Sequence, residues 1–243
     1  MLKYKLYLII LLILTVSSVF IYKYRHQLPS PEIIMETIVP APTIIQENGL
    51  SNKHLIKTAF VPQAPEKKWD QPWQDACEES ALLAVHYYYQ SLDPKTDEMV
   101  NDLNKLFEYE TSQGWSHDVT LSQMATVSAE LWGYQSEIIE NPTILDFKKY
   151  LVKDIPIIIP SNGKTLFKEN THFKSGGPWY HNLVILGYDD DKNQFTVHDV
   201  GTQFGAYFRY SYATLMESIH DFPPSLKKED ISQGVPRALV LIK

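Results

Sequence analysis

The stretch HNLVILGYDDDKNQFTVHDVGT, residues 181–202, predicts a β-hairpin and thereby the type of fold. Residues 181–188 form a largely apolar run, residues 189–193 are rich in Asp, and residues 194–199 begin a second run. Two runs separated by a polar turn of this kind are typical of paired antiparallel strands. Because the second strand returns along the first, Asp199 is expected to lie roughly level with His181.

Further strands are predicted on both sides of this hairpin. The run IPIIIP, residues 155–160, is β-branched and bounded by prolines, which favours a buried strand. A long loop at 161–180, with three glycines and a proline, separates this run from the hairpin. After the hairpin we expect a strand at 208–210, a short helix at 211–220 and a final strand, RALVLIK, at 237–243.

The first half of the folded region has helical patterns instead. Around Cys77 the apolar residues recur at helical spacing, and Asp75 followed by Glu78 predicts a capping box at the start of that helix. The other expected helices are 96–108, 121–132 with Thr120 as N-cap, and 144–152 with Thr143 as N-cap. Helices followed by an antiparallel sheet indicate an α+β fold, with an N-terminal helical part packed on the sheet.

Composition restricts the class of protein. The chain has 243 residues, of which 44% are hydrophobic, so it can bury a large core and suits one domain with appendages. The net charge of −7 argues against a nucleic-acid partner, because binding phosphate requires a basic face. The single cysteine, Cys77, rules out an internal disulfide.

The N-terminal residues 1–25 are predicted to be a transmembrane anchor or a signal segment. Residues 6–22 contain no charge, and at about 1.5 Å per residue in a helix they can span a thin bilayer. Residues 16–18, VSS, also resemble a signal-peptide cleavage site. We favour an uncleaved anchor, because the apolar run continues past that site. The expected location is a single-pass cell-membrane protein with its domain outside the cytoplasm, or a secreted protein if the segment is cleaved.

Residues 26–58 are predicted to be a linker that leads to a domain at 59–243. Four prolines between positions 29 and 42 prevent a regular helix there and favour an extended spacer.

Cys77 lies where a nucleophile could be activated. At the second position of its helix, free backbone N–H groups and the helix dipole would favour a thiolate. Two carboxylates follow directly, Glu78 and Glu79, and negative charge nearby raises the pKa of a thiol. Since consecutive helical residues diverge by about 100°, the two side chains can point away from the sulfur.

His181 is the candidate base, and Asp199 is the group expected to orient its imidazole ring. His198 is a near rival for the base, but strand alternation turns it to the face opposite Asp199. Gln71, six residues before the cysteine, is the candidate amide donor to an oxyanion, with Gln74 as its competitor. The ordered set of amide, thiol, imidazole and carboxylate indicates catalysis better than any one member does.

These residues resemble a known family. The segments VPQAPEKKWDQPWQDACEES (61–80), IPIIIP (155–160) and the hairpin at 181–202 are similar to those of the C39-like peptidases. These are papain-like cysteine peptidases related to the double-glycine leader peptidases. The resemblance implies a papain-like fold, with Cys77 as nucleophile, His181 as general base, Asp199 as orienting acid and Gln71 as oxyanion glutamine.

The sequence departs from the family pattern at two positions. Glu78 replaces the glycine that follows the nucleophile in the leader peptidases, and Val200 replaces a proline that often follows the orienting acid. Neither change removes a catalytic group. A single hydrophobic segment cannot form an exporter. The resemblance therefore does not imply that this chain cleaves leader peptides as a peptidase fused to an exporter.

The predicted activity is hydrolysis of peptide or isopeptide bonds in a peptide or protein substrate, by a membrane-tethered cysteine peptidase without a cofactor. One alternative is a non-catalytic module that binds a peptide or cell-wall ligand through aromatic side chains: Trp69, Trp73, Trp115, Trp179 and Tyr180. A second is transglutaminase-like acyl transfer, which uses the same triad.

The loop at 161–180 is either a lid or a plain surface loop. No metal site is predicted, because His172, His181 and His198 lack the spacing of a ligand set.

Overall fold

The predicted hairpin lies within the sheet of the computed structural model, which describes residues 49–243. Strand β4 (Tyr180–Asp189) pairs antiparallel with β5 (Gln194–His198), as the sequence predicts. The predicted anchor at 1–25 and most of the predicted linker at 26–58 lie outside the described residues. Within 49–243, no helix combines the length and the apolar character that a bilayer crossing requires.

The remaining strands extend the sheet on both sides of this hairpin. The strand order is β2-β7-β3-β4-β5-β6, with β1 also paired to β4, and every pairing is antiparallel. The further strands are β1 (Lys53–Leu55), β2 (Gln135–Glu140), β3 (Ile157–Asn162), β6 (Phe208–Ser211) and β7 (Arg237–Ile242). Strand β3 begins two residues later than expected, because the backbone N–H of Ile155 donates to Tyr150 at the end of the preceding helix.

Two strands, β1 and β2, have no counterpart in the sequence prediction. Strand β1 lies within the range 26–58 assigned to the linker and pairs with the end of β4. The ladder between β4 and β5 is irregular around Gly187, and a Cβ added there would lie 2.3 Å from the carbonyl oxygen of His54. Glycine at this position therefore lets β1 approach β4 closely.

The helices are α2 (Cys77–Gln90), α3 (Thr96–Ser112), α4 (Leu121–Trp132), α5 (Ile144–Leu151), α6 (Gly163–Leu166) and α7 (Tyr212–Ser218), with short 3-10 helices at Trp73–Asp75 and Lys228–Gln233. The bounds of α4 match the prediction, and Thr120 caps it by accepting from Gln123 at 3.3 Å. Thr143 likewise caps α5. Helix α6 lies inside the segment predicted as a loop, and α3 extends to Ser112.

The predicted cap of the cysteine helix is wrong. Helix α2 begins at Cys77 with Ala76 as N-cap and no side-chain cap, so the cysteine takes the first helical position rather than the second. Asp75 belongs to the preceding 3-10 helix, where its carboxylate accepts from Gln71 at 2.6 Å and lies 3.5 Å from Lys228. The side chain is therefore committed elsewhere and is not free to cap α2.

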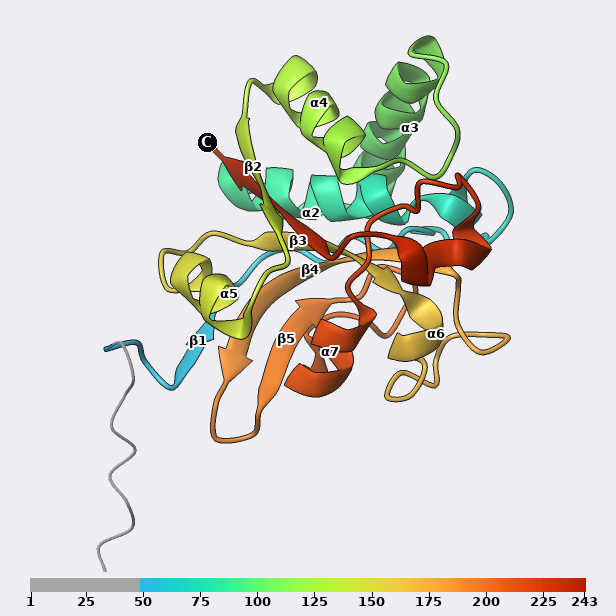
Figure 1. Cartoon of the computed structure of the whole chain (residues 1–243). Coiled ribbons are helices and arrows are strands. Elements are labelled where there is room, and N and C mark those ends of the chain that lie inside the picture. The colour runs from blue at the N-terminus through green and yellow to red at the C-terminus, as the bar shows by residue number, and fades with distance from the viewer. Residues whose placement is uncertain (1–48) are drawn as a thin grey trace, which may run out of the picture. The chain divides into compact units, whose positions relative to one another are not determined.

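The α+β arrangement is confirmed. In Figure 1, α2, α3 and α4 gather in the upper part of the view, and α5, α6 and α7 lie in the lower part. Strand β4 is buried along nearly its whole length and contacts α2. The side chains of Leu82, Val85 and Val184 are fully or almost fully buried in the common core. Since burying each such side chain contributes about 1.5–3 kcal/mol, this packing holds α2 against β4.

Candidate active site

The hairpin brings His181 and Asp199 into direct contact. The Nε2 atom of His181 lies 2.8 Å from Oδ1 of Asp199, and both side chains are almost completely buried. An ionised carboxylate can only accept a hydrogen bond, so Nε2 carries the hydrogen. The other ring nitrogen, Nδ1, is then the one that can accept a proton. This is the tautomer that a general base requires.

The carboxylate of Asp199 is held by three donors besides His181. Oδ1 also accepts from the backbone N–H of Gly201 at 3.3 Å, while Oδ2 accepts from Asn170 at 2.9 Å and from the hydroxyl of Tyr210 at 2.5 Å. Burial acts to raise the pKa of Asp199, but the interaction with His181 and the hydrogen bonds from Tyr210 and Asn170 outweigh it and lower the pKa. Asp199 is therefore built to stay ionised.

The His181 ring is enclosed on its other sides. Phe173 contacts it edge-on, with ring centroids 5.3 Å apart. A Cβ added at Gly201 would lie 2.6 Å from Cε1 of the ring. Asn170 and Phe173 both come from the segment 161–180, so this segment holds the His181–Asp199 pair in place and is more than a surface loop.

Cys77 lies at the start of α2 beside β4, with 5% of its surface exposed. Its thiol donates to Oε2 of Glu78 at 2.9 Å, and the side-chain nitrogen of Asn182 lies 4.0 Å from the sulfur. Asn182 is the neighbour of His181 on β4. Across residues 49–243, no hydrogen bond joins the Cys77 sulfur to His181.

The pKa of the resting thiol is raised, whereas the position at a helix N-terminus was expected to lower it. Burial raises the pKa of Cys77 well above its usual value, and the negative charge of Glu78 raises it further. Helical geometry allowed the Glu78 side chain to point away from the sulfur. In the structure it instead points toward the sulfur and accepts the hydrogen bond of the thiol. The helix N-terminus alone does not produce a thiolate here.

The other predicted polar residues lie in separate environments. The exposed Gln71 donates its amide to Asp75 and makes no hydrogen bond to Cys77. Gln74 is also exposed. The ring of His198 lies 3.2 Å from the carbonyl of Thr58 and accepts from the backbone of Tyr207 at 3.1 Å. Burial lowers the pKa of His198 to about 4.

Sequence reasoning missed four side chains that support this region. Gln63 is buried and donates its amide to the carbonyls of Trp73 and Gln74, four and three residues before Cys77, at 3.0 and 2.8 Å. Its own backbone N–H donates to Val200, next to Asp199. The others are Asn170, Asn182 and Tyr210. Asn182 adjoins His181 in the sequence, so only for this residue was there a local signal.

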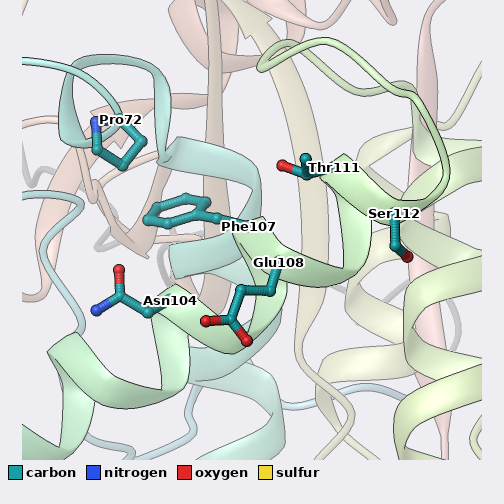
Figure 2. Close-up of a pocket in the computed structure, with 6 residues that line it drawn as sticks. All are labelled: Pro72, Asn104, Phe107, Glu108, Thr111 and Ser112. Atoms are coloured by element: carbon teal, nitrogen blue, oxygen red, sulfur yellow. The ribbon is translucent and has the colours of Figure 1, made fainter.

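A groove of about 430 Å³ lies beside the turn that precedes Cys77 (Figure 2). In Figure 2 the ring of Phe107, on α3, extends toward Pro72. Phe107 also contacts Trp73 edge-on, with centroids 5.5 Å apart. The remaining lining residues are Asn104, Glu108, Thr111 and Ser112. None of the predicted catalytic residues lines this groove.

The aromatic residues of the alternative binding module contact different parts of the fold. Trp115 contacts Tyr109, Lys164 lies 5.0 Å from the ring centroid of Trp179, and the hydroxyl of Tyr180 donates to Val119. They do not form one shared stacking surface. In the part of the chain that the structure describes, no three His, Cys, Asp or Glu side chains are grouped to hold a metal ion.

The chain matches a protein-family model and a solved structure. The model of the Peptidase_C39 like family matches residues 58–221. A crystal structure from Bacillus anthracis, assigned as a C39-like peptidase, matches with 13% identity and a TM-score of 0.33, covering 51% of this chain and 60% of that one. No curated protein matches the chain. Because the family model covers well over half of the sequence, including Cys77, His181 and Asp199, the chain belongs to the Peptidase C39-like family.

Proposed function

We propose that the chain is a cysteine peptidase that hydrolyses peptide or isopeptide bonds with Cys77, His181 and Asp199. The observation that carries the proposal is the buried His181–Asp199 pair, in which Nε2 of the ring lies 2.8 Å from Oδ1 of the carboxylate. A buried imidazole bonded to an ionised carboxylate is the arrangement that orients a general base.

The reaction would use each group in turn. His181 takes the thiol proton at Nδ1, and the thiolate of Cys77 attacks the carbonyl carbon of the scissile bond. The imidazolium then protonates the leaving amine, and a water molecule hydrolyses the resulting thioester. Asp199 keeps the ring in one orientation and stabilises its positive charge. The thiol has to leave Glu78 before it can transfer its proton to His181.

The oxyanion of the intermediate requires donors near the sulfur. The backbone N–H of Cys77 is at the first position of α2 and has no partner within the helix. Gln71 is our proposed side-chain donor, in keeping with its exposed position before the nucleophile. It would exchange its hydrogen bond with Asp75 for one with the oxyanion.

We also propose that residues 1–25 attach the enzyme to the cell membrane, with the domain at 59–243 outside the cytoplasm. The uncharged run at 6–22 supports this location. Alkaline extraction of membranes, followed by protease treatment of intact cells, tests it. A chain released by alkali, or protected from external protease, would count against a membrane-anchored external enzyme.

The activity is tested by incubating the full chain with a peptide library and identifying products by mass spectrometry. Turnover should disappear in Cys77→Ala and fall strongly in His181→Ala and Asp199→Asn. His198→Asn is the matched control, because His198 is equally buried in the same hairpin but its ring bonds Thr58 and Tyr207 instead of the Asp199 carboxylate. Cleavage that persists in Cys77→Ala would refute the proposed nucleophile.

The same assay separates hydrolysis from acyl transfer. An added primary amine competes with water for the thioester. If most of the product carries the amine, the transglutaminase-like reaction replaces hydrolysis as the function. If the free acid dominates at every amine concentration, the chain is a hydrolase.

A further inference from the structure

The thiol of Cys77 contacts a carboxylate that the catalytic cycle described above does not use. The sulfur lies 2.9 Å from Oε2 of Glu78, and the Glu78 side chain is fully buried. The second carboxylate oxygen, Oε1, accepts from the backbone N–H of Val119 at 3.2 Å. Both oxygens therefore have a defined partner, and one of these partners is the nucleophile.

The position of Glu78 is fixed by two elements besides α2. Val119 precedes α4, and its carbonyl accepts from the hydroxyl of Tyr180 on β4 at 3.0 Å. The same peptide segment thus links Glu78 to the strand that carries His181. A carboxyl group whose two oxygens both have fixed partners can orient the thiol, beyond contributing to packing.

We propose that Glu78 is a positioning residue for the nucleophile, which accepts the hydrogen bond of the resting thiol and thereby controls when Cys77 becomes available to His181. The assignment rests on the proposed role of Cys77 as nucleophile. It also gives a purpose to the residue at which this chain departs from the leader-peptidase pattern.

The surroundings of the pair reinforce this control. Groups from every neighbouring element act on it: Glu79 on α2, Glu110 on α3, Asp118 before α4, Tyr180 and Asn182 on β4, and Lys228, which pairs with Asp118 and Asp75. Burial raises the pKa of Glu78 well above its usual value, and the nearby charge of Asp118 adds to this. Burial, with the neighbouring Glu78 and Glu79, likewise raises the pKa of the thiol, which favours its protonated form.

Activation then requires one proton transfer. The thiol leaves Oε2, its S–H bond breaks, and a new N–H bond forms at Nδ1 of His181. The sulfur becomes the thiolate and the ring becomes the imidazolium, while Glu78 keeps its own protonation state. No external oxidant or co-reactant is involved.

The test is the pH profile of iodoacetamide alkylation of the full chain, which has a single cysteine. Glu78→Gln retains the size of the side chain and an oxygen for Val119, but places an amide N–H donor, which favours the thiolate, where the thiol now finds an acceptor. We expect its profile to move at least about one pH unit lower, which makes alkylation near neutral pH about tenfold faster. Glu108→Gln is the control for a Glu→Gln change, because Glu108 is an exposed glutamate of α3 that does not act on the pair.

A wild-type profile in folded Glu78→Gln protein would overturn the assignment. If that variant does not fold, the infrared S–H band of the wild-type chain gives the answer, with Cys77→Ser as blank. A band shifted by strong hydrogen bonding supports the assignment, and a band at the free-thiol position refutes it.

Peptide turnover, measured on the same preparations, keeps this inference separate from the proposed function. A shifted profile without turnover in any variant supports the role of Glu78 and counts against the peptidase. Turnover with an unshifted profile supports the peptidase and counts against the role of Glu78.

Discussion

Glu110 should make the folded chain less stable as the pH rises through the weakly acidic range. Its carboxyl group, on α3, interacts with that of Glu79 on α2, and both side chains are almost fully buried. Burial raises the pKa of Glu110 from its ordinary 4.5 to about 7. Between these values the folded state retains a proton that the unfolded state has lost, so the stability falls as pH increases.

The size of this effect follows from the shift in pKa. A rise from 4.5 to about 7 corresponds to about 3 kcal/mol of unfolding free energy, lost between pH 4.5 and 7 and constant above that range. Glu110→Gln keeps a hydrogen-bonding side chain next to Glu79 without a proton to lose. The variant should therefore gain stability relative to the wild type as the pH rises from 5 to 8.

The assay is urea unfolding of the wild type and Glu110→Gln at several pH values between 4.5 and 8. His198 acts in the opposite direction, since its pKa of about 4 makes the fold lose stability as the pH falls from 6.5. The informative quantity is therefore the difference between the two proteins. Glu108→Gln, at an exposed glutamate of the same helix, is the control. If the difference between wild type and Glu110→Gln does not change with pH, the buried carboxyl pair does not have the assigned energetics.

Three further predictions concern the surroundings of the site. Tyr210→Phe removes a hydrogen bond to the buried Asp199 carboxylate, so urea unfolding should show a loss of about 1.5–3 kcal/mol; an unchanged midpoint would contradict this. Gly201→Ala places a methyl group against His181, and a shift of the ring by about 1 Å should reduce kcat on a cleaved peptide by about 10²-fold; full activity would show that the ring has room to move. His198→Asn removes a histidine that is buried neutral, and acid unfolding should start at a lower pH than in the wild type; an identical acid transition would refute this role.

Local signals predicted the parts of the fold that local interactions determine. Helix α4 has the predicted bounds because Thr120 and Gln123 form a capping box within four residues. Asp75 carries an equally good local signal, but contacts with Gln71 and the distant Lys228 occupy its carboxylate. Strand β2 was missed because its side chains are largely exposed, and its pairing with β7 joins segments about a hundred residues apart.

The candidate site shows the same division. The contact of His181 with Asp199 follows from a tight hairpin, which the sequence of that segment alone predicts. The contacts of Asp199 with Asn170 and Tyr210 depend on how a separate loop and strand fold over the hairpin. The contact of Glu78 with the sulfur depends on Val119, a residue distant in the sequence, whose backbone N–H donates to the other oxygen of the same carboxylate.

The burial of Cys77 and His181, with 5% and 1% of their surfaces exposed, has a kinetic consequence. A peptide bond cannot reach either side chain until the site opens, so every encounter begins with a conformational step. As the concentration of a thiol reagent increases, the modification rate should therefore level off at the rate of opening instead of rising in proportion. With a single cysteine in the chain, that plateau measures directly how often this site opens.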